Sequence, residues 1–257
     1  MTRAEEAAHA LLEARRTGTT IEAIPEACRP TTIDDAYAVQ DALVRLSGSK
    51  VVGWKLGATT PYWQKRAGLT HPMGGRLLET HMHRGDTTLK GADYHLRMIE
   101  SEYGFLLGKD LPPREEEYSR EEVWDAVAVV HGCIEIADTR YSKGLKMDTP
   151  SLIADNVLAG AYVVGPEIKD RAFDLEHAPV KFFVDGALVN EGKGEHTGGH
   201  PILPMVWLAN DRRKRGDGLK AGMIISTGST TGAYRSPETA VMRAEFGSFG
   251  SVELRLT

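Results

Sequence analysis

Two glutamates stand one residue apart in the stretch MIESEYGFLLGKDL, which runs from Met98 to Leu111. The apolar residues around them predict a buried β-strand, in which residues two apart point to the same face at a spacing of about 6.6 Å. Glu100 and Glu102 are therefore expected to project together. Two like charges on a partly buried face repel, and a divalent cation between them is the usual resolution. Oxygen ligands favour a hard ion, so Mg²⁺ is expected first, with Mn²⁺ or Ca²⁺ as alternatives.

A third acid lies in similar surroundings. Glu135 stands inside the apolar run CIEIA, which extends from Cys133 to Ala137, and this run also reads as an internal strand. Its presence favours a metal site made of three carboxylates. The alternative is that Glu100 and Glu102 line the solvent face of an edge strand, where charged side chains are common.

The elements that must position these acids fall into two parts of the chain. Residues 2–16 have the spacing of an amphipathic helix, and a second helix is predicted to begin near Thr32 and to end at Gly48. From Val51 onward, short β-branched or aromatic runs alternate with Gly, Pro and Asp turns, which is typical of a β-rich body. We therefore expect an α+β fold with a helical N-terminal unit at residues 1–50 and a β-rich domain at residues 51–257.

Several elements within that body can be predicted individually. The capping-box pattern at Ser119 predicts a helix whose apolar face extends as far as Val130. Asp185-Gly186 predicts a hairpin turn, and residues 201–213 read as a helix. The other expected strands are residues 51–56, 98–107, 133–137, 181–184, 187–190, 223–226, 240–246 and 251–256.

Composition excludes several classes of protein. The net charge is −5, and the basic run at residues 212–215 falls where a helix ends, so we expect no nucleic-acid partner. Cys28 and Cys133 have no paired-metal spacing. The chain has neither an N-terminal signal pattern nor a run of about 18 apolar residues, so we expect a soluble, cytoplasmic protein with no membrane contact.

A set of motifs taken together resembles the fumarylacetoacetate hydrolase superfamily, and more closely its branch of 2-keto-4-pentenoate hydratases and 4-oxalocrotonate decarboxylases from aromatic hydrocarbon catabolism. The resemblance covers about residues 35–257 and rests on the order of the motifs. These are GWKLG at 53–57, ESEYGFLLGKDL at 100–111, IEIADTR at 134–140, ADN at 154–156, PILPMVWLAN at 201–210 and LKAGMIISTGS at 219–229.

The resemblance implies a mixed β-sheet roll and a Mg²⁺ ion held by Glu100, Glu102 and Glu135. It also implies that Lys55 points into the same pocket and meets the carboxylate or enolate of a small 2-oxo acid substrate. The alternative for Lys55 is a structural salt bridge to a nearby carboxylate. The branch further implies a homo-oligomer and a complex between a hydratase and a sister decarboxylase.

Three further residues are candidates for contact with the substrate. Thr227, Gly228 and Ser229 follow a predicted strand, where their N–H groups and hydroxyls could hold a carboxylate or could form a plain turn. We expect them to contribute to substrate binding.

One departure from the branch leaves the reaction open. Hydratases carry an acid 18 positions after the lysine, where this chain has Met73. An apolar residue there is more like the decarboxylases, although His71, His81 and His83 lie in the same segment. Imidazole is a competent base near neutral pH, and His71 is the most economical replacement.

Hydration is favoured slightly. A decarboxylase substrate carries a second carboxylate, for which Arg76 and Arg140 are the only candidate cations that the sequence suggests. Carbon–carbon bond hydrolysis of an acylpyruvate and an inactive ligand-binding partner subunit remain alternatives.

Overall fold

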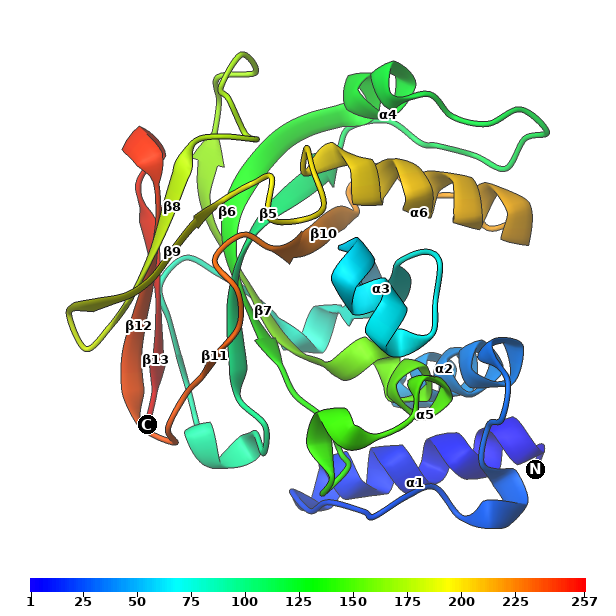
Figure 1. The fold of residues 1–257 in the computed structure, drawn as a ribbon. Coiled ribbons are helices and arrows are strands. Elements are labelled where there is room, and N and C mark those ends of the chain that lie inside the picture. Colours follow the sequence, from blue (N-terminus) through cyan, green and yellow to red (C-terminus); the bar gives the residue numbers. More distant parts are fainter.

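The computed structural model describes residues 1–257 and contains two β-sheets and six α-helices (Figure 1). The larger sheet has the strand order β2-β1-β10-β5-β6-β7-β3, with β11 paired to β5. Its strands are β1 (Val51–Gly57), β2 (Met73–Leu78), β3 (Met82–Arg84), β5 (Met98–Leu107), β6 (Val127–Ala137), β7 (Ala159–Ile168), β10 (Ile224–Ser229) and β11 (Tyr234–Arg235). The smaller sheet has the order β4-β13-β12-β8-β9. Its strands are β4 (Thr87–Leu89), β8 (Pro179–Val184), β9 (Ala187–Lys193), β12 (Ala240–Phe246) and β13 (Ser251–Leu256).

The helices cover the ends and one side of the larger sheet. In Figure 1, α4 and α6 lie above the concave side of the sheet, and α1, α2 and α5 gather below it, on the side of the N-terminus. The helices are α1 (Arg3–Thr17), α2 (Ile33–Ser47), α3 (Pro61–Ala67), α4 (Arg120–Ala126), α5 (Thr149–Ala154) and α6 (Ile202–Arg215). None of them is both long and apolar enough to cross a lipid bilayer.

The two faces of β5 have different surroundings, because side chains alternate along a strand. Ile99, Tyr103 and Phe105 are buried in the main hydrophobic core, where the ring of Tyr103 lies 5.7 Å from that of Phe246 in the smaller sheet. Glu100 and Glu102 alternate with these residues and so face the concave side of the larger sheet. The strand therefore combines an apolar face, which holds the two sheets together, with a face that carries acids.

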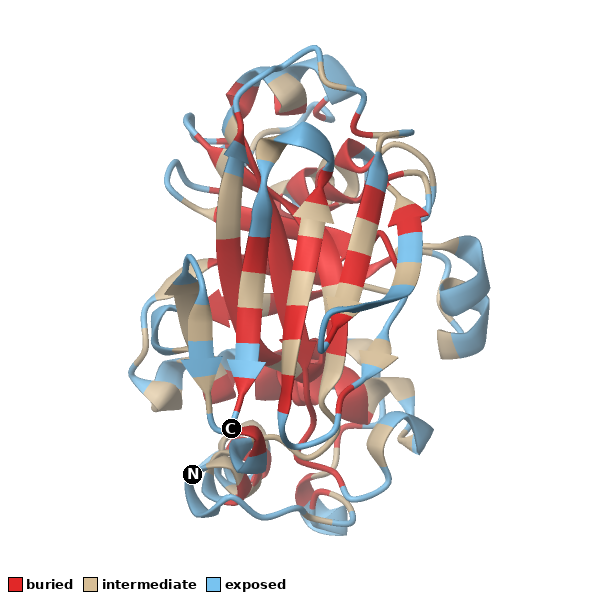
Figure 2. Ribbon diagram, turned by 90° about the vertical axis from the view of Figure 1, so that its left-hand side faces the viewer, coloured by how far each residue is buried: buried red, intermediate tan, exposed pale blue.

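The smaller sheet forms an outer layer of the molecule. Along β12, buried residues alternate with less buried ones, and Figure 2 shows this banding on the strands that face the viewer. The hairpin between β8 and β9 turns at Asp185 and Gly186, as the sequence predicts. The mixed α+β roll expected from the sequence is confirmed.

Both N-terminal helices are confirmed, and they share their core with later residues. Thr2 and Thr32 cap them, and each helix ends at a glycine with positive φ. Leu11 and Leu43 lie in one buried cluster with Met73 of β2 and with residues of α5. The boundary at residue 50 stays a prediction, but these helices bury their apolar faces against the β-rich part of the chain.

Two elements differ from expectation. The helix that Ser119 caps ends at Ala126, and Val127 and Val130 belong to β6 instead of its apolar face. β-Branched residues fit a pleated strand better than a helix, and β6 pairs with β5 along most of its length. Long-range pairing therefore overrides the local helical pattern. Likewise, Thr227–Ser229 form the end of β10 and not a segment that follows a strand.

Candidate active site

The three acids meet on the concave face of the larger sheet. Glu100 lies directly opposite Glu135 in the pairing of β5 with β6, and Glu102 lies opposite Cys133. One carboxylate oxygen from each of the three acids lies within 4.8 Å of the others. Glu102 and Glu135 are 0% and 1% exposed; neither carboxylate oxygen of Glu102 accepts a hydrogen bond, and Oε1 of Glu135 lies 3.0 Å from Lys55 Nζ. Strand register alone thus gathers acids that are 33 to 35 positions apart in the chain.

Burial and mutual repulsion shift the proton affinity of these carboxylates. Burial, followed by the charge of Glu135, raises the pKa of Glu100 to about 7, while Lys55 opposes the shift. Burial and the other two acids likewise raise the pKa of Glu102 well above its ordinary range. Such a cluster is unstable with all three groups charged unless a cation joins it.

Lys55 supplies the only cationic side chain beside the acids. Its Nζ lies 3.0 Å from Glu135 Oε1 and donates a hydrogen bond of 2.9 Å to the main-chain oxygen of Val157. Burial lowers the pKa of Lys55, but the charges of the three acids outweigh burial and raise it overall. The ammonium group is therefore charged and fixed in place, and its contact with a substrate stays a prediction. It forms a salt bridge, and it does so at the acid cluster.

A strained turn presents the carbonyl that holds Lys55. Asn156, Val157 and Leu158 have φ angles of 54°, 52° and 62°, although none is glycine. Such a conformation costs on the order of 1–3 kcal/mol per residue and persists only where the surroundings enforce it. Here the Asn156 side chain enforces it. Its Oδ1 accepts from the main-chain N–H of Arg76 at 2.7 Å, and its Nδ2 donates to the Arg76 carbonyl at 2.8 Å.

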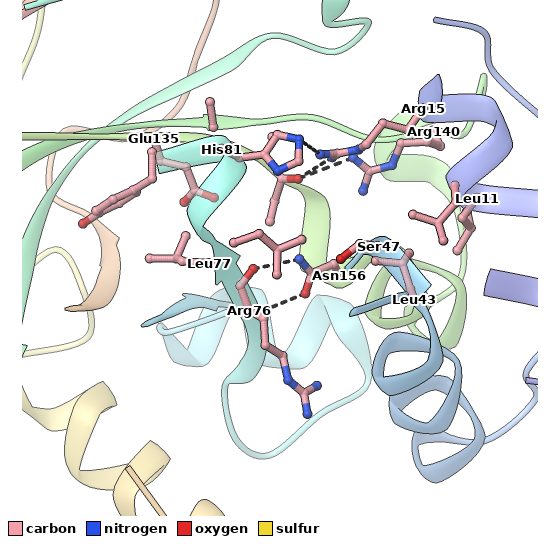
Figure 3. Close-up of a pocket in the computed structure, with 16 residues that line it drawn as sticks. Leu11, Arg15, Leu43, Ser47, Arg76, Leu77, His81, Glu135, Arg140 and Asn156 are labelled. Atoms are coloured by element: carbon pink, nitrogen blue, oxygen red, sulfur yellow. Dashed lines mark hydrogen bonds between the residues drawn. The ribbon is translucent and has the colours of Figure 1, made fainter. Parts of the chain in front are cut away.

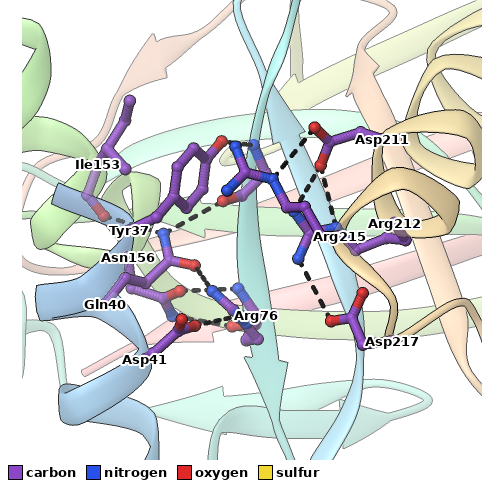
Figure 4. A network of polar contacts seen from close by, with 11 residues as sticks. Tyr37, Gln40, Asp41, Arg76, Ile153, Asn156, Asp211, Arg212, Arg215 and Asp217 are labelled. Carbon is purple, nitrogen blue, oxygen red and sulfur yellow. Dashed lines mark hydrogen bonds and ion pairs between the residues drawn. The ribbon is translucent and has the colours of Figure 1, made fainter. Parts of the chain in front are cut away.

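A wider polar network connects this turn to β2, α2 and α5 (Figure 4). The guanidinium of Arg76 bonds to Gln40 and Asp41 on α2 and lies 4.4 Å above the ring of Trp54. Gln40 in turn donates to the carbonyl of Ile153 in α5 at 2.9 Å. The hydrogen bond from Lys55 to the Val157 carbonyl connects this network directly to the acid cluster.

Sequence reasoning missed three buried polar groups on the same face. Ser226 lies beside Lys55 in the pairing of β10 with β1, and Tyr162 lies opposite Glu135 in the pairing of β7 with β6. The hydroxyls of both have no hydrogen-bond partner. Cys133 lies opposite Glu102 and belongs to the buried cluster that contains Tyr162. Only strand register reveals them, because each stands in an ordinary apolar strand sequence.

The residues at the end of β10 lie at the edge of this site. Ser229 lies opposite Glu102, next to an irregularity in the pairing of β10 with β5, and its hydroxyl has no hydrogen-bond partner. The hydroxyl of Thr227 donates to the Tyr103 carbonyl at 3.3 Å. Gly228 has a φ of 99°, and a side chain there would overlap Thr59. Of the three, Ser229 is placed best to meet a ligand.

The structure does not bring His71 to the acids. Its ring stacks on Trp207 of α6, with 5.4 Å between the centroids, and its Nδ1 lies 2.8 Å from the Pro72 carbonyl oxygen. Met73 follows in β2, opposite Gly57, and is buried in the cluster beneath α1 and α2. A general-base role for His71 stays a prediction, and it requires the ring to leave Trp207.

A narrow pocket reaches Glu135 from the side of the N-terminal helices (Figure 3). Its cavity volume is small, about 50 Å³. Residues from α1, α2, β2, β6 and β7 line it, as do His81 and Arg140. The pocket gives a small ligand a path to the carboxylate cluster.

The donor set fits a hard divalent cation. Three carboxylates that converge within 4.8 Å are the kind of ligand set that Mg²⁺ and Ca²⁺ prefer, and both oxygens of Glu102 lack a hydrogen-bond partner. The charge balance agrees, because three acids and one lysine leave a deficit of two positive charges when all are ionised. A neutral ligand would leave that deficit in place.

Residues 72–256 match the sequence model described as fumarylacetoacetate (FAA) hydrolase C-terminal. The chain belongs to this family. It is 33% identical to a 2-keto-4-pentenoate hydratase of Paraburkholderia xenovorans (strain LB400), over 96% of this chain and 93% of that one. It is 30% identical to a 4-oxalocrotonate decarboxylase of a Pseudomonas species, over 88% of this chain and 90% of that one. The resemblance inferred from the motifs is therefore confirmed.

Solved structures of the fumarylacetoacetate hydrolase family agree with this assignment. The chain superposes on 4-oxalocrotonate decarboxylase from Pseudomonas putida G7, in complex with magnesium and adipate, with a TM-score of 0.92. The two share 25% identity, and the match covers 100% of this chain and 99% of that one. The same decarboxylase has also been solved with calcium and acetate. These relatives include hydratases and decarboxylases, so family membership alone leaves both reactions available.

Proposed function

We propose that this member of the fumarylacetoacetate hydrolase family is a Mg²⁺-dependent lyase that acts on a small 2-oxo acid. The observation that carries the proposal is the buried cluster of three carboxylates with Lys55. Hydration of a 2-hydroxydienoate is the main reading, supported by 33% identity to a 2-keto-4-pentenoate hydratase along nearly the whole chain. Glu100, Glu102 and Glu135 would hold the ion.

Mg²⁺ supplies Lewis acidity for the keto oxygen and carboxylate of a 2-oxo acid, which favours the enolate. The protein's own contribution begins with Lys55. Its ammonium, fixed between Glu135 and the Val157 carbonyl, adds a positive charge that needs no reorganisation when negative charge develops on the substrate. Its donors can also meet the substrate's carboxylate directly.

The remaining polar groups of the site serve binding and proton movement in this proposal. Ser229 and Ser226 have free hydroxyls that can bond to substrate oxygens. Tyr162 is a neutral donor, because burial, followed by Cys133 and Glu102, raises its pKa well above its ordinary range. Hydration also needs a group that exchanges protons with water, and Met73 cannot do this. His71 is the candidate that the sequence offers, on condition that it turns from Trp207.

Decarboxylation is the second candidate, and a specific observation favours it. Met73 occupies the position where hydratases carry an acid, and the fold superposes on a 4-oxalocrotonate decarboxylase with a TM-score of 0.92. Vinylogous decarboxylation passes through the same dienolate and needs no attacking water. The carbon–carbon bond electrons remain in the dienolate while the carboxyl group leaves as CO₂.

One assay separates the two reactions. Purified protein with Mg²⁺ is offered 2-hydroxypenta-2,4-dienoate and 2-oxohex-3-enedioate in turn, with ultraviolet detection, product mass and CO₂ measurement. Hydration predicts loss of dienoate absorbance with a product heavier by one water and no CO₂. CO₂ release in step with consumption of the hexenedioate would replace hydration by decarboxylation. No EDTA-sensitive turnover of either compound would contradict both reactions and leave hydrolysis of an acylpyruvate or an inactive ligand-binding subunit.

Three lesser points belong to the same proposal. Mn²⁺ is expected to substitute for Mg²⁺, because both accept carboxylate oxygens in similar geometry. A homo-oligomer, and a complex with a sister hydratase or decarboxylase, are proposed from the family resemblance and can be checked by light scattering. The cytoplasmic location stays a prediction.

A further inference from the structure

The pocket that reaches Glu135 has a cationic far end. In Figure 3, Glu135 lies at one side of the pocket, Arg15 and Arg140 lie at the other, and His81 lies between them. Arg15 comes from α1, and its Nη2 donates a hydrogen bond of 2.7 Å to the Ala159 carbonyl at the start of β7. Two guanidinium groups therefore converge on one end of a pocket whose other end is formed in part by Glu135, one of the three clustered acids.

The two arginines differ in their partners. Arg140 is bonded to Asp155 by both its side chain and its main chain, and this buried pair neutralises its charge. Arg15 forms no salt bridge. Its other neighbour is His81, whose Nε2 lies 2.8 Å from Arg15 Nη1. Arg15 is thus a partly buried cation that lines a pocket without an anionic partner of its own.

The electrostatics agree with that description. Burial, followed by the charge of Arg140, lowers the pKa of Arg15 to about 9, so the group is charged at neutral pH but poorly compensated. Burial, followed by Arg15, lowers the pKa of His81 to about 4, which keeps the imidazole neutral. A neutral His81 can accept the Arg15 hydrogen bond but cannot supply negative charge. A bound carboxylate can.

The walls between the two ends are largely apolar. They include Leu11 of α1, Leu43 of α2, Leu77 of β2 and Ala161 of β7. Such walls suit a short hydrocarbon chain, whereas a polar chain would lose its hydration without compensation. The pocket as a whole thus has a site for a 2-oxo acid head, an apolar middle and a cation at the tail.

We propose that Arg15 is a specificity-determining residue that binds a second carboxylate at the far end of the substrate, so that the preferred substrates are 2-oxo dicarboxylic acids. This inference rests on the proposed function, because it takes the head of the substrate to lie at the three acids. The guanidinium offers two parallel N–H donors to a carboxylate, a geometry that an ammonium group lacks.

The chemistry of the far carboxylate bears on the reaction. A carboxylate that leaves as CO₂ loses its charge in the transition state, so an ion pair to Arg15 would stabilise the substrate more than the transition state. A far carboxylate that survives the reaction keeps the ion pair throughout. Arg15 therefore fits hydration of a dicarboxylate better than decarboxylation at that carboxylate.

Calorimetric binding of unreactive saturated acids tests the proposal. Full-length protein with saturating Mg²⁺ is titrated with 2-oxoglutarate, 2-oxoadipate and 2-oxopimelate, and with the 2-oxo monocarboxylic acids of the same chain lengths. We expect at least one dicarboxylate to bind roughly 10- to 100-fold more tightly than its monocarboxylate counterpart, the range for a charged hydrogen-bonded pair. Arg15→Met is expected to abolish that preference and to leave the monocarboxylates unchanged.

Two further variants sharpen the result. Arg15→Lys keeps the charge and is expected to restore part of the preference. Arg16→Met removes the adjacent, exposed arginine of the same helix, which pairs with Glu13. This control is expected to leave the affinities for both series of acids unchanged. Equal affinities of the wild type for both series would overturn the proposal. So would an Arg15→Met variant that binds both series more weakly to the same extent, because this is the result expected if Arg15 only holds α1 in place.

Failure of the proposed reaction gives a different result. Turnover of unsaturated substrates is measured separately on the same preparations. A dicarboxylate preference that depends on Arg15, without turnover, would contradict the lyase proposal and leave the binding site standing. Turnover without any dicarboxylate preference would contradict the role of Arg15 and leave the lyase proposal standing.

Discussion

Binding of Mg²⁺ to this protein should weaken as the pH falls through 7. The perturbation is a change of pH from 8 to 6, and the responding group is Glu100. Burial, and then Glu135, raises the pKa of its carboxyl group to about 7. A metal ion requires the ionised carboxylate, so protons and Mg²⁺ compete for this group.

The size of the effect follows from that pKa. With one competing proton and a pKa of about 7, the ionised fraction of Glu100 falls from about ten-elevenths at pH 8 to about one-eleventh at pH 6. The dissociation constant should therefore rise about tenfold, which corresponds to about 1.4 kcal/mol. Glu102, whose pKa is also raised, can only steepen the dependence.

Isothermal titration calorimetry measures both the affinity for Mg²⁺ and the release of protons on binding. Titrations at pH 6, 7 and 8 give the affinity, and titrations at pH 6 in buffers of different ionisation enthalpy give the number of protons released. We expect at least about one proton released per Mg²⁺ at pH 6, from Glu100, and more to the extent that Glu102 is also protonated. An affinity that is constant from pH 6 to 8, with no proton release, would refute the raised pKa of Glu100.

The same pKa has a consequence for the metal-free protein. The folded state holds a proton on Glu100 that the unfolded chain, with an ordinary value of 4.5, has already released above pH 5. The contribution of this group to stability is therefore fully present below pH 4.5 and is lost as the pH rises through about 7. Added Mg²⁺ should offset that loss, which thermal unfolding at pH 8 with and without Mg²⁺ can check.

Four substitutions test the other parts of the site. Glu102→Gln removes one of three ligands without changing shape, so calorimetry should show Mg²⁺ affinity lower by on the order of 100-fold or more, and unchanged affinity would remove Glu102 from the metal site. Lys55→Met should lower kcat by roughly 10²–10³-fold while Mg²⁺ binding persists, and ordinary turnover would make Lys55 purely structural. Asn156→Ala leaves the main-chain N–H and carbonyl of Arg76 without their partners and releases the Val157 carbonyl. It should lower the free energy of unfolding by about 1–3 kcal/mol in denaturant unfolding and should lower kcat. A variant as stable as the wild type would show that the turn forms without Asn156. If His71 turns from Trp207 to serve hydration as its general base, His71→Ala should lower kcat by roughly 10²–10⁴-fold, and a loss of less than tenfold would show instead that the ring stays stacked on Trp207.

The sequence was sufficient to place Glu100 and Glu102 on one face, because the alternation of a strand is a local property, whereas their meeting with Glu135 depends on the register of β5 with β6. Glu100 and Glu102 are two residues apart, so they must share a face wherever the strand lies. The N-terminal helices and the hairpin at Asp185-Gly186 were equally accessible, since their caps and turn residues act over a few positions. Local signals failed at Val127 and Val130, where pairing with β5 extends a strand into a predicted helix.

What the sequence by itself determined, then, is which residues could share a face and which chemistry they could perform. Only the tertiary structure decided which of those faces meet. It placed Ser226 beside Lys55 and Tyr162 opposite Glu135, it turned His71 toward Trp207, and it carried Arg15 from the first helix to the pocket of the acid cluster. The physical reason is that strand register and helix docking depend on the burial of apolar surface contributed by distant segments, and no short window of sequence contains that information.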